Sequence, residues 1–249
     1  MEKKRFVLET QMRAGTHYMC HALLNAYHPY MHYPLRNGGT RQLEHAEIER
    51  GLKEEARIDN IEINYGIEIL FRHYYHKLEL DPAFSGEKKI ALIGFPLDSF
   101  YSDGIVFSSE HYTPSPSLGR ETARGYVMGQ GSKEWDFLYP YMIDNARWLE
   151  TLSRQGNGEN LLIVRYEDLI DNFIVEKRRV IDFMQLDLVG ELPEPRKNRN
   201  RMYWNNNYAE RFDAEALRTL FQLFRRSIEA FYPEHYENLD QMLIDSGAR

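Results

Sequence analysis

The clearest pattern along the chain is a set of short, nearly continuous apolar runs separated by longer amphipathic stretches. Three runs stand out: RFVLET (5–10), KKIALIGF (88–95) and NLLIVRY (160–166). Strands buried on both faces of a parallel sheet have this composition, whereas half-exposed strands alternate apolar and polar residues. A fourth run, EINYGIEILFRHYYH (62–76), predicts one more strand.

Helical periodicity fills much of the sequence between these runs. Apolar residues recur with helical spacing over five ranges: 16–27, 42–56, 138–154, 173–186 and 213–230. Alternation of buried strands with helices predicts an α/β fold with a doubly wound, mainly parallel sheet and helices on both faces. No repeat, low-complexity tract or linker divides the sequence, so we expect one domain over residues 1–249.

Two stretches lack regular periodicity. Residues 103–134 are rich in Ser, Gly, Thr and Pro, which predicts a long surface excursion. Residues 191–212 combine two prolines and several arginines with an aromatic cluster. Loops of this length often bind a ligand, and residues 28–45 likewise hold many Tyr, His and Gly residues, so we expect both segments to line a binding site.

Composition and charge narrow the classes of protein. The 249 residues are 43% hydrophobic, enough for a sizeable core, and the net charge of −7 argues against general nucleic-acid binding. The single cysteine, Cys20, fits a reducing compartment, and its place on the apolar side of a predicted helix favours a buried thiol over a nucleophile. No apolar run of 18 residues and no signal-peptide core occur, so we expect a cytoplasmic protein without a membrane span.

The first apolar run leads into QMRAGTHYM, which has the strand–loop–helix order of many phosphate sites. Loop amides and the first helical N–H groups point outward there, and the helix dipole favours an anion. Gly15 permits close backbone approach, Thr16 offers a capping hydroxyl, and Arg13 offers a charged fork for phosphate or sulfate oxygens. An ordinary turn capped by Thr16 accounts for the same residues. The nucleotide-triphosphatase, dinucleotide and zinc signatures are absent from the sequence.

This loop resembles the 5′-phosphosulfate loop of the sulfotransferases that use PAPS (3′-phosphoadenosine 5′-phosphosulfate), written P-K-[ST]-G-[TS]-[TS]-[WY]. Arg13 stands for the family lysine, Gly15 and Thr16 match, and Tyr18 stands for the aromatic residue. The resemblance implies that six consecutive residues bind the phosphosulfate group: Arg13, Ala14, Gly15, Thr16, His17 and Tyr18.

Two more stretches resemble later parts of the same family. FPLDSFYSD is similar to the segment R-[ND]-P-x-D-x-x-x-S, with Pro96, Asp98 and Ser102 at the matching offsets. The resemblance implies that Ser102 contacts the 3′-phosphate, but Gly94 occupies the place of the family arginine. LLIVRYEDLI resembles the Y-E-D-L strand end, which implies that Tyr166 packs near the nucleotide and that Glu167 and Asp168 begin a loop.

A fourth stretch, EPRKNRNRMYWNNNY, resembles the terminal R-K-G-x-x-G-x-W-[KR]-N loop that wraps the 3′-phosphate. The glycines of that loop are missing here, and a solvated basic loop is the alternative interpretation. Arg199 and Arg201 are candidates for the cation that is missing at Gly94. The nucleotide ligands implied by the resemblance are Arg196, Lys197, Arg199 and Trp204.

The resemblance implies transfer of a sulfuryl group from PAPS, without a metal, to a hydroxyl of a small-molecule or carbohydrate acceptor. Arg13 would stabilise the leaving phosphate by charge alone, because a guanidinium does not give up its proton. The base that accepts the hydroxyl proton is His73, or else His76 or Glu68, and His17 is placed to touch the sulfuryl group. Two alternatives stay open: a P-loop kinase-like phosphotransferase, and a nucleotide-binding member of the family without turnover, which Gly94 favours.

Overall fold

The structure is a computed structural model, and it describes residues 4–11, 14–15, 19, 28–34, 40–42, 65–73, 86–108, 138–186, 199 and 201–245. The chain forms two compact units. The first unit comprises residues 1–93 and 156–198, and the second comprises residues 94–155 and 199–249. Each unit therefore combines two segments of the chain, and the single domain expected from the sequence stays a prediction.

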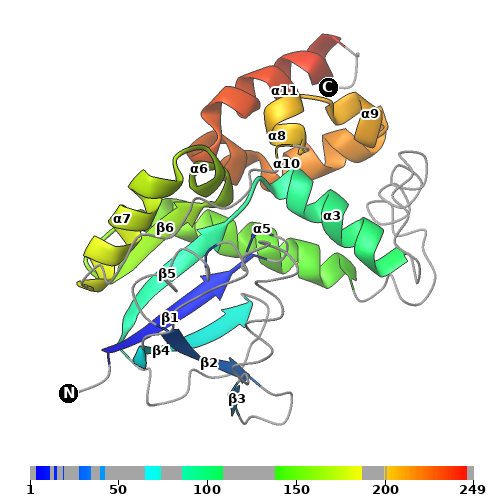
Figure 1. The fold of residues 1–249 in the computed structure, drawn as a ribbon. Coiled ribbons are helices and arrows are strands. Elements are labelled where there is room, and N and C mark those ends of the chain that lie inside the picture. The colour runs from blue at the N-terminus through cyan, green and yellow to red at the C-terminus, as the bar shows by residue number, and fades with distance from the viewer. Residues whose placement is uncertain are drawn as a thin grey trace. The chain divides into compact units, whose positions relative to one another are not determined.

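The first unit is built on a six-stranded sheet with the order β3-β2-β4-β1-β5-β6 (Figure 1). Strand β3 is antiparallel to β2, and the other neighbouring strands are parallel. This arrangement confirms the predicted mainly parallel α/β sheet. The strands are β1 (Lys4–Thr10), β2 (His28–Pro34), β3 (Thr40–Gln42), β4 (Tyr65–His73), β5 (Lys88–Ile93) and β6 (Leu161–Arg165).

Strand β1 lies between β4 and β5, and the winding of the chain reverses there. Strands β2, β3 and β4 lie on one side of β1, whereas β5 and β6 lie on the other. Three consecutive residues of β1, Phe6, Val7 and Leu8, are buried, so both faces of the strand are covered. In doubly wound sheets, ligands bind beyond the carboxyl ends of the strands at such a reversal. The segment after Thr10 therefore occupies the position where a ligand is expected.

Strand β6 has its outer edge covered by side chains. The Ile163 N–H donates to Asn157 Oδ1 at 2.6 Å, and the Ile163 carbonyl accepts from Arg179 Nη2 at 2.9 Å. Arg179 lies on α7 (Phe173–Met184), which follows the short helix α6 (Tyr166–Asp171). Because an exposed edge invites pairing with another chain, these two bonds protect β6.

The end of α7 is fixed by a left-handed residue and a cation. Gln185 has φ +54°, and the Leu186 N–H returns to the Ile181 carbonyl at 3.0 Å, which is a common way to end a helix. Lys88 Nζ donates to the Phe183 carbonyl at 2.9 Å and lies 5.0 Å from the Phe183 ring centroid. A cation at this end of a helix is favourable because the carbonyls there carry partial negative charge.

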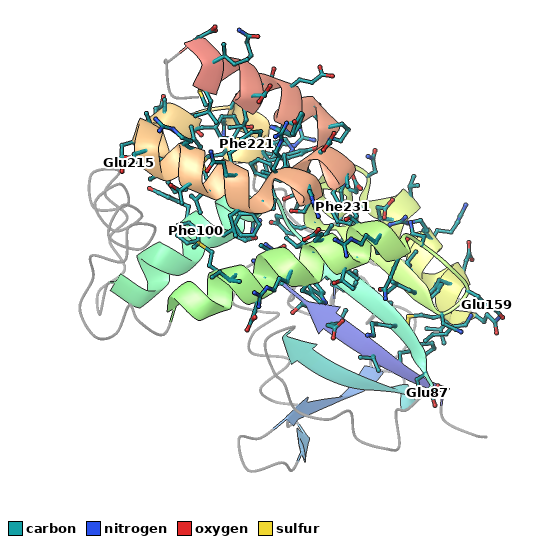
Figure 2. The ribbon with its side chains drawn as sticks, turned by 180° about the vertical axis from the view of Figure 1, so that it is seen from behind. Glu87, Phe100, Glu159, Glu215, Phe221 and Phe231 are labelled. Atoms are coloured by element: carbon teal, nitrogen blue, oxygen red, sulfur yellow. The ribbon has the colours of Figure 1, made fainter. Side chains whose placement is uncertain are left out.

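The second unit is helical. Its longest C-terminal helix is α10 (Ala214–Phe231), whose start is capped by Asp213 Oδ1 accepting the Ala216 N–H at 2.8 Å. Figure 2 marks Glu215 at the first turn of α10 and Phe221 and Phe231 farther along it. Buried residues recur along one face of α10: Ala216, Leu217, Leu220, Phe221, Phe224, Ser227 and Ile228. The other helices are α3 (Pro96–Ser108), α5 (Leu138–Gln155), α8 (Met202–Asn205), α9 (Tyr208–Arg211) and α11 (Pro233–Asp245).

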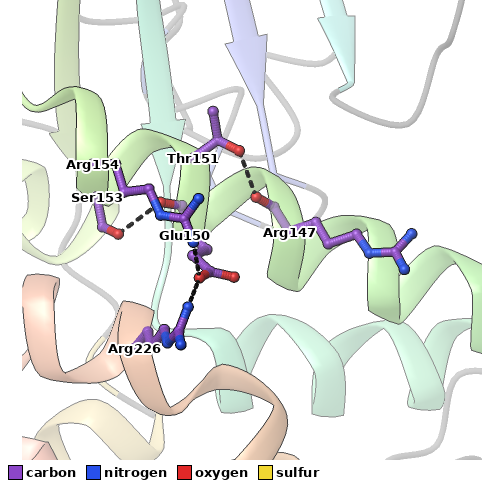
Figure 3. A network of polar contacts seen from close by, with 6 residues as sticks. All are labelled: Arg147, Glu150, Thr151, Ser153, Arg154 and Arg226. Carbon is purple, nitrogen blue, oxygen red and sulfur yellow. Dashed lines mark hydrogen bonds and ion pairs between the residues drawn. The ribbon is translucent and has the colours of Figure 1, made fainter.

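A polar network links α5 to α10 on the surface of this unit (Figure 3). Glu150 of α5 accepts from Arg226 of α10 and, one helical turn along α5, from Arg154 at 2.5 Å. Arg226 and Arg154 have exposed side chains, so solvent screens the pair. Both interactions lower the pKa of Glu150, with the hydrogen bond from Arg226 as the largest cause.

Several elements differ from the sequence predictions. Strands β2 and β3 and helices α3 and α11 were not predicted, and the first residues of the 103–134 stretch continue α3 to Ser108. The 191–212 stretch contains the two short helices α8 and α9. Of the predicted helix 16–27, only Met19 is described, and the predicted helix 42–56 lies outside the described residues except for Gln42, which ends β3. No helix among the described residues is both long and apolar enough to cross a membrane.

Candidate functional site

Strand β1 ends, and the loop after it begins, with buried polar residues. Glu9, Thr10 and Gln11 are all at most 4% exposed, although they follow the apolar run directly. The Gln11 N–H donates to the Leu92 carbonyl of β5 at 2.9 Å, and the Ala14 N–H donates to the Gln11 carbonyl at 3.3 Å. The loop therefore leaves β1 in a position fixed by the neighbouring strand.

Gly15 closes this loop and opens the helical segment. Its carbonyl accepts the Met19 N–H at 3.1 Å, which is the four-residue spacing of an α-helical hydrogen bond. Its φ is +77°, in the left-handed region that glycine adopts without steric cost. The local sequence thus supplies a glycine at the one described loop position whose backbone requires it.

Tyr166 packs directly on Gly15. A Cβ added at Gly15 would lie 2.0 Å from Tyr166 Cδ2 and 2.2 Å from Cε2. Tyr166 is 7% exposed and is the first residue of α6, immediately after β6. Two stretches far apart in the sequence, each singled out for its chemistry, therefore meet at one point of the first unit.

The residues on either side of Tyr166 hold the start of α6. Arg165 forms a double contact with Asp168: Nε donates to Oδ2 at 2.8 Å, and Nη2 to Oδ1 at 2.5 Å. Glu167 is completely buried. The sequence interpretation placed Glu167 and Asp168 in a loop, but they form the first turn of α6, where carboxylates interact favourably with the helix dipole.

Strand register places His73 beside the end of β1. His73 is the last residue of β4 and pairs with Thr10, the last residue of β1. Glu68 pairs with Arg5, five residues earlier along β4. At 3.3 Å per residue, Glu68 is about 17 Å back along the strand from His73. The third candidate base, His76, lies outside the described residues.

An ion pair between a buried carboxylate and a half-buried lysine joins β1 to β5, and the sequence interpretation missed it. Glu9 Oε2 is 3.4 Å from Lys89 Nζ of β5, and the Glu9 side chain is only 6% exposed. A buried carboxylate needs such a partner because water cannot solvate it. The signal in the sequence is the abrupt change from apolar residues to Glu-Thr-Gln at the strand end.

In the second unit, Asp98 holds the start of α8. The Met202 N–H donates to Asp98 Oδ1 at 2.8 Å, and the Tyr203 N–H donates to Oδ2 at 3.0 Å. Asp98 is 6% exposed, and burial raises the pKa of its carboxyl while the charges of Arg201 and Arg211 oppose that shift. Asp98, which lies on α3, is thus tied to the basic segment, by which we mean Arg199 and residues 201–205.

Arg211, which the sequence interpretation did not single out, is the second arginine whose charge acts on Asp98. Its Nη1 donates to the Tyr101 hydroxyl at 3.0 Å, and its guanidinium carbon lies 5.0 Å from the centroid of the Tyr101 ring. Tyr101 immediately precedes Ser102, the half-buried serine that the sequence assigns to the 3′-phosphate. Arg211 lies beyond the last position of the R-K-G-x-x-G-x-W-[KR]-N pattern, so that pattern does not identify it.

Arg199 and Trp204 lie in the basic segment itself. Asn205 Nδ2 donates to the Arg199 carbonyl at 3.1 Å and to the Arg201 carbonyl at 2.9 Å, and so fixes the backbone of both arginines. The ring centroid of Trp204 lies 5.2 Å from that of Tyr203, in an edge-to-face arrangement. Arg199 is exposed and Trp204 half-buried, so both are accessible to a ligand.

Phe95, next to the Gly94 that departs from the family pattern, is a core residue of the second unit. It is completely buried, and its ring centroid lies 4.9 Å from that of His235 and 5.2 Å from that of Tyr232. His235 Nδ1 is hydrogen-bonded to the Tyr208 hydroxyl, whose pKa is raised mainly by burial. The position after Gly94 therefore serves packing, since an aromatic cluster surrounds it.

The remaining sequence candidates lie outside the described residues. Besides His76, these are Arg13, Thr16, His17, Tyr18, Cys20, Arg196 and Lys197. Of the phosphosulfate loop, the structure describes Ala14, which is completely buried, and Gly15. The contact between Gly15 and Tyr166 and the register of His73 with Thr10 both belong to the first unit. The surroundings of Asp98 belong to the second.

Comparison with known proteins finds a similar structure but no similar sequence. No family model matches the chain, and no curated protein matches it in sequence. Among solved structures, mouse sulfotransferase SULT7A1 complexed with PAP (3′-phosphoadenosine 5′-phosphate) is similar, with a TM-score of 0.53 and 14% sequence identity. The similarity covers 98% of this chain and 90% of that chain. The chain therefore has a sulfotransferase-like α/β fold.

Proposed function

We propose that the protein transfers the sulfuryl group of PAPS to a hydroxyl of a small-molecule or carbohydrate acceptor. The observation that carries the proposal is the packing of Tyr166 on Gly15. This contact joins the loop that resembles the phosphosulfate loop to the strand end that resembles Y-E-D-L. The sulfotransferase-like fold, shared with a protein whose structure contains PAP, supports the same function.

The loop after β1 is assigned to the 5′-phosphosulfate group. The bond from the Met19 N–H to the Gly15 carbonyl marks the beginning of a helical turn directly after the loop. The beginning of a helix carries unpaired amides and partial positive charge, which stabilise an anion. Arg13 adds a permanent charge, and the assigned residues are Arg13, Ala14, Gly15, Thr16, His17 and Tyr18, with Tyr166 packed beside them.

The reaction is an in-line displacement at sulfur. The acceptor oxygen forms a new bond to sulfur while the bond from sulfur to the 5′-phosphate oxygen breaks, and PAP leaves. Negative charge grows on the leaving phosphate, as it does in phosphoryl transfer. Arg13 stabilises that charge, and the acceptor hydroxyl gives its proton to a base.

His73 is proposed as that base. Its backbone lies at the carboxyl end of β4, level with Thr10 and beside the start of the loop. Glu68 is set back along the same strand, so the register favours His73 over Glu68. An imidazole also titrates near neutral pH, which suits proton transfer from a hydroxyl. His76 stays the rival candidate.

The 3′-phosphate is assigned to polar and basic residues. Ser102 keeps the place of the family serine, and the basic segment offers several cations. The assigned residues are Ser102, Arg196, Lys197, Arg199 and Trp204.

Two measurements test the proposal. Isothermal calorimetry compares PAP with ATP, and a transfer assay with labelled PAPS uses a panel of phenols, sugars and lipid alcohols. We expect PAP to bind more tightly than ATP, and the Arg13→Ala variant to lose about 10²–10³-fold in turnover. Arg147→Ala, which removes an exposed arginine of α5, is the matched control and keeps full turnover. Binding of ATP in preference to PAP would overturn the proposed function. Full turnover in a folded Arg13→Ala variant would overturn the role given to Arg13.

A nucleotide-binding protein without turnover is the second candidate, favoured by Gly94 in the place of the family arginine. It predicts binding of PAP with no sulfuryl transfer to any member of the acceptor panel.

A further inference from the structure

Asp98 is a buried carboxylate whose two oxygens are both used by one distant segment. Oδ1 accepts the Met202 N–H at 2.8 Å, and Oδ2 accepts the Tyr203 N–H at 3.0 Å. These amides belong to the first turn of α8. A carboxylate that is 6% exposed and accepts two backbone amides fixes the position of that turn.

The same segment is braced from within. Asn205 Nδ2 donates to the Arg199 and Arg201 carbonyls at 3.1 and 2.9 Å. Asp98 therefore holds the first turn of α8 from α3, while Asn205 holds the backbone that leads into it. Together these hydrogen bonds fix the backbone from which the side chains of Arg199 and Arg201 extend.

Positive charge collects around the carboxylate that holds the segment. Arg201 and Arg211 both act electrostatically on Asp98, and Arg211 is itself fixed by its hydrogen bond to the Tyr101 hydroxyl. Two arginines thus act on one buried carboxylate, Glu234 accepts from the Tyr203 hydroxyl of the same turn at 3.4 Å, and Arg199 is exposed. Guanidinium groups are suited to bind a phosphate dianion because they combine a permanent charge with paired donors.

From this geometry we infer that Asp98 is a positioning residue: through its two hydrogen bonds to α8 it sets the basic segment (Arg199 and residues 201–205) to bind the 3′-phosphate of the nucleotide. The inference rests on the proposed function. We assign Asp98 no contact with the nucleotide, because its side chain is buried and a carboxylate would repel the 3′-phosphate. It acts through Arg199 and Arg201, and Arg211 supplies charge in the place of the missing family arginine.

The experiment measures the affinity that the 3′-phosphate adds. PAP and AMP (adenosine 5′-phosphate) differ only in the 3′-phosphate, so the ratio of their Kd values reports this group alone. In the Asp98→Asn variant the amide Nδ2 replaces one acceptor oxygen, and one backbone N–H loses its partner. We expect PAP binding to weaken by about 10- to 100-fold, whereas AMP binding changes by less than about 2-fold.

Two further variants separate positioning from general stability. Asn205→Ala removes the internal brace at an exposed position, so it tests the inference even if Asp98→Asn does not fold, and it is expected to reduce the PAP to AMP preference as well. Asp213→Asn alters another capping aspartate of the same unit, at α10, and keeps the preference of the wild type.

The outcomes are distinct. Loss of the preference in Asp98→Asn and Asn205→Ala, with retention in Asp213→Asn, supports the inference. An unchanged preference in a folded Asp98→Asn variant, or in Asn205→Ala where Asp98→Asn does not fold, overturns the inference and leaves the proposed function standing. A wild-type protein that binds AMP as tightly as PAP overturns the proposed function and the inference with it.

Discussion

The ring of Tyr166 occupies the space in which a side chain at residue 15 would have to lie. A Cβ at Gly15 would be 2.0 Å from Tyr166 Cδ2, far inside van der Waals contact, and the φ of +77° also disfavours any other residue. Two independent constraints, one steric and one in the backbone, therefore require glycine at this position. The contact ties the loop after β1 to the end of β6.

Replacing Gly15 by alanine is expected to destabilise the protein strongly. Alanine would have to adopt the left-handed backbone conformation and would overlap the Tyr166 ring. Together these two costs should lower the free energy of unfolding, measured by urea denaturation, by roughly 2–5 kcal/mol. Gly86→Ala is the matched control: Gly86 has φ +85°, but nothing lies within 4 Å of an added Cβ. It should lose only about 1–2 kcal/mol. Equal losses in the two variants would show that the overlap carries no cost.

A double-mutant cycle tests the Tyr166 contact itself. Tyr166→Ala removes the ring that obstructs residue 15, so alanine at position 15 costs less in that background than in the wild type. We expect a coupling of about 1–2 kcal/mol between Gly15→Ala and Tyr166→Ala in the free energy of unfolding. Simple additivity of the two changes would mean that the ring moves aside freely.

The sequence predicted the central strands because burial on both faces leaves a continuous apolar run, as in Phe6-Val7-Leu8. It did not predict β2, whose residues HPYMHYP contain two prolines and no apolar run, or α3, whose first turns contain Ser, Asp and Gly. Gly15 was assigned to close approach of a phosphate, but its partner Tyr166 could not be deduced, since only the order of the strands brings them together. Asp98 was found by motif offset, whereas its hydrogen bonds to α8 depend on the packing of α3.

His73 is expected to control the acidic limb of the pH–rate profile. As the base, His73 must be neutral to accept the acceptor proton, so protonation at acid pH lowers kcat in the wild type. His73→Ala is expected to lose about 10²–10⁴-fold in kcat together with that limb. His76→Ala is the comparison, because it removes the rival histidine. An unaltered limb in His73→Ala, with the limb lost in His76→Ala, would assign the base to His76.

Burial of Asp98 gives a prediction for stability. Its pKa is raised in the folded protein, so the folded state binds the proton more tightly than the unfolded chain does. The stability associated with protonated Asp98 is therefore fully present below the unfolded pKa of 3.8 and is lost as pH rises through the folded pKa. The free energy of unfolding of the wild type minus that of Asp98→Asn should fall as pH rises from about 4 to 8. A difference that stays constant or grows over this range would contradict the raised pKa.

The Glu150 network predicts the opposite dependence on pH. The hydrogen bond from Arg226 and the contact with Arg154 lower the pKa of Glu150 below its ordinary value of 4.5. Its contribution to stability is therefore present above pH 4.5 and is lost as pH falls through the lowered pKa. Glu150→Gln should lower Tm at pH 7 by at most about 3 °C, since the pair is exposed, and by progressively less as pH falls below 4.5.

Glu159→Gln is the matched control for Glu150→Gln, because Glu159 is an exposed glutamate in the turn before β6. High salt should shrink the Tm difference between wild type and Glu150→Gln at pH 7, since ions screen exposed charges. A Tm difference between wild type and Glu150→Gln that does not shrink as pH falls below 4.5 would contradict the assignment of the effect to the charge of Glu150. The pH dependence thus separates the charge of Glu150 from its aliphatic contacts, which the glutamine variant retains.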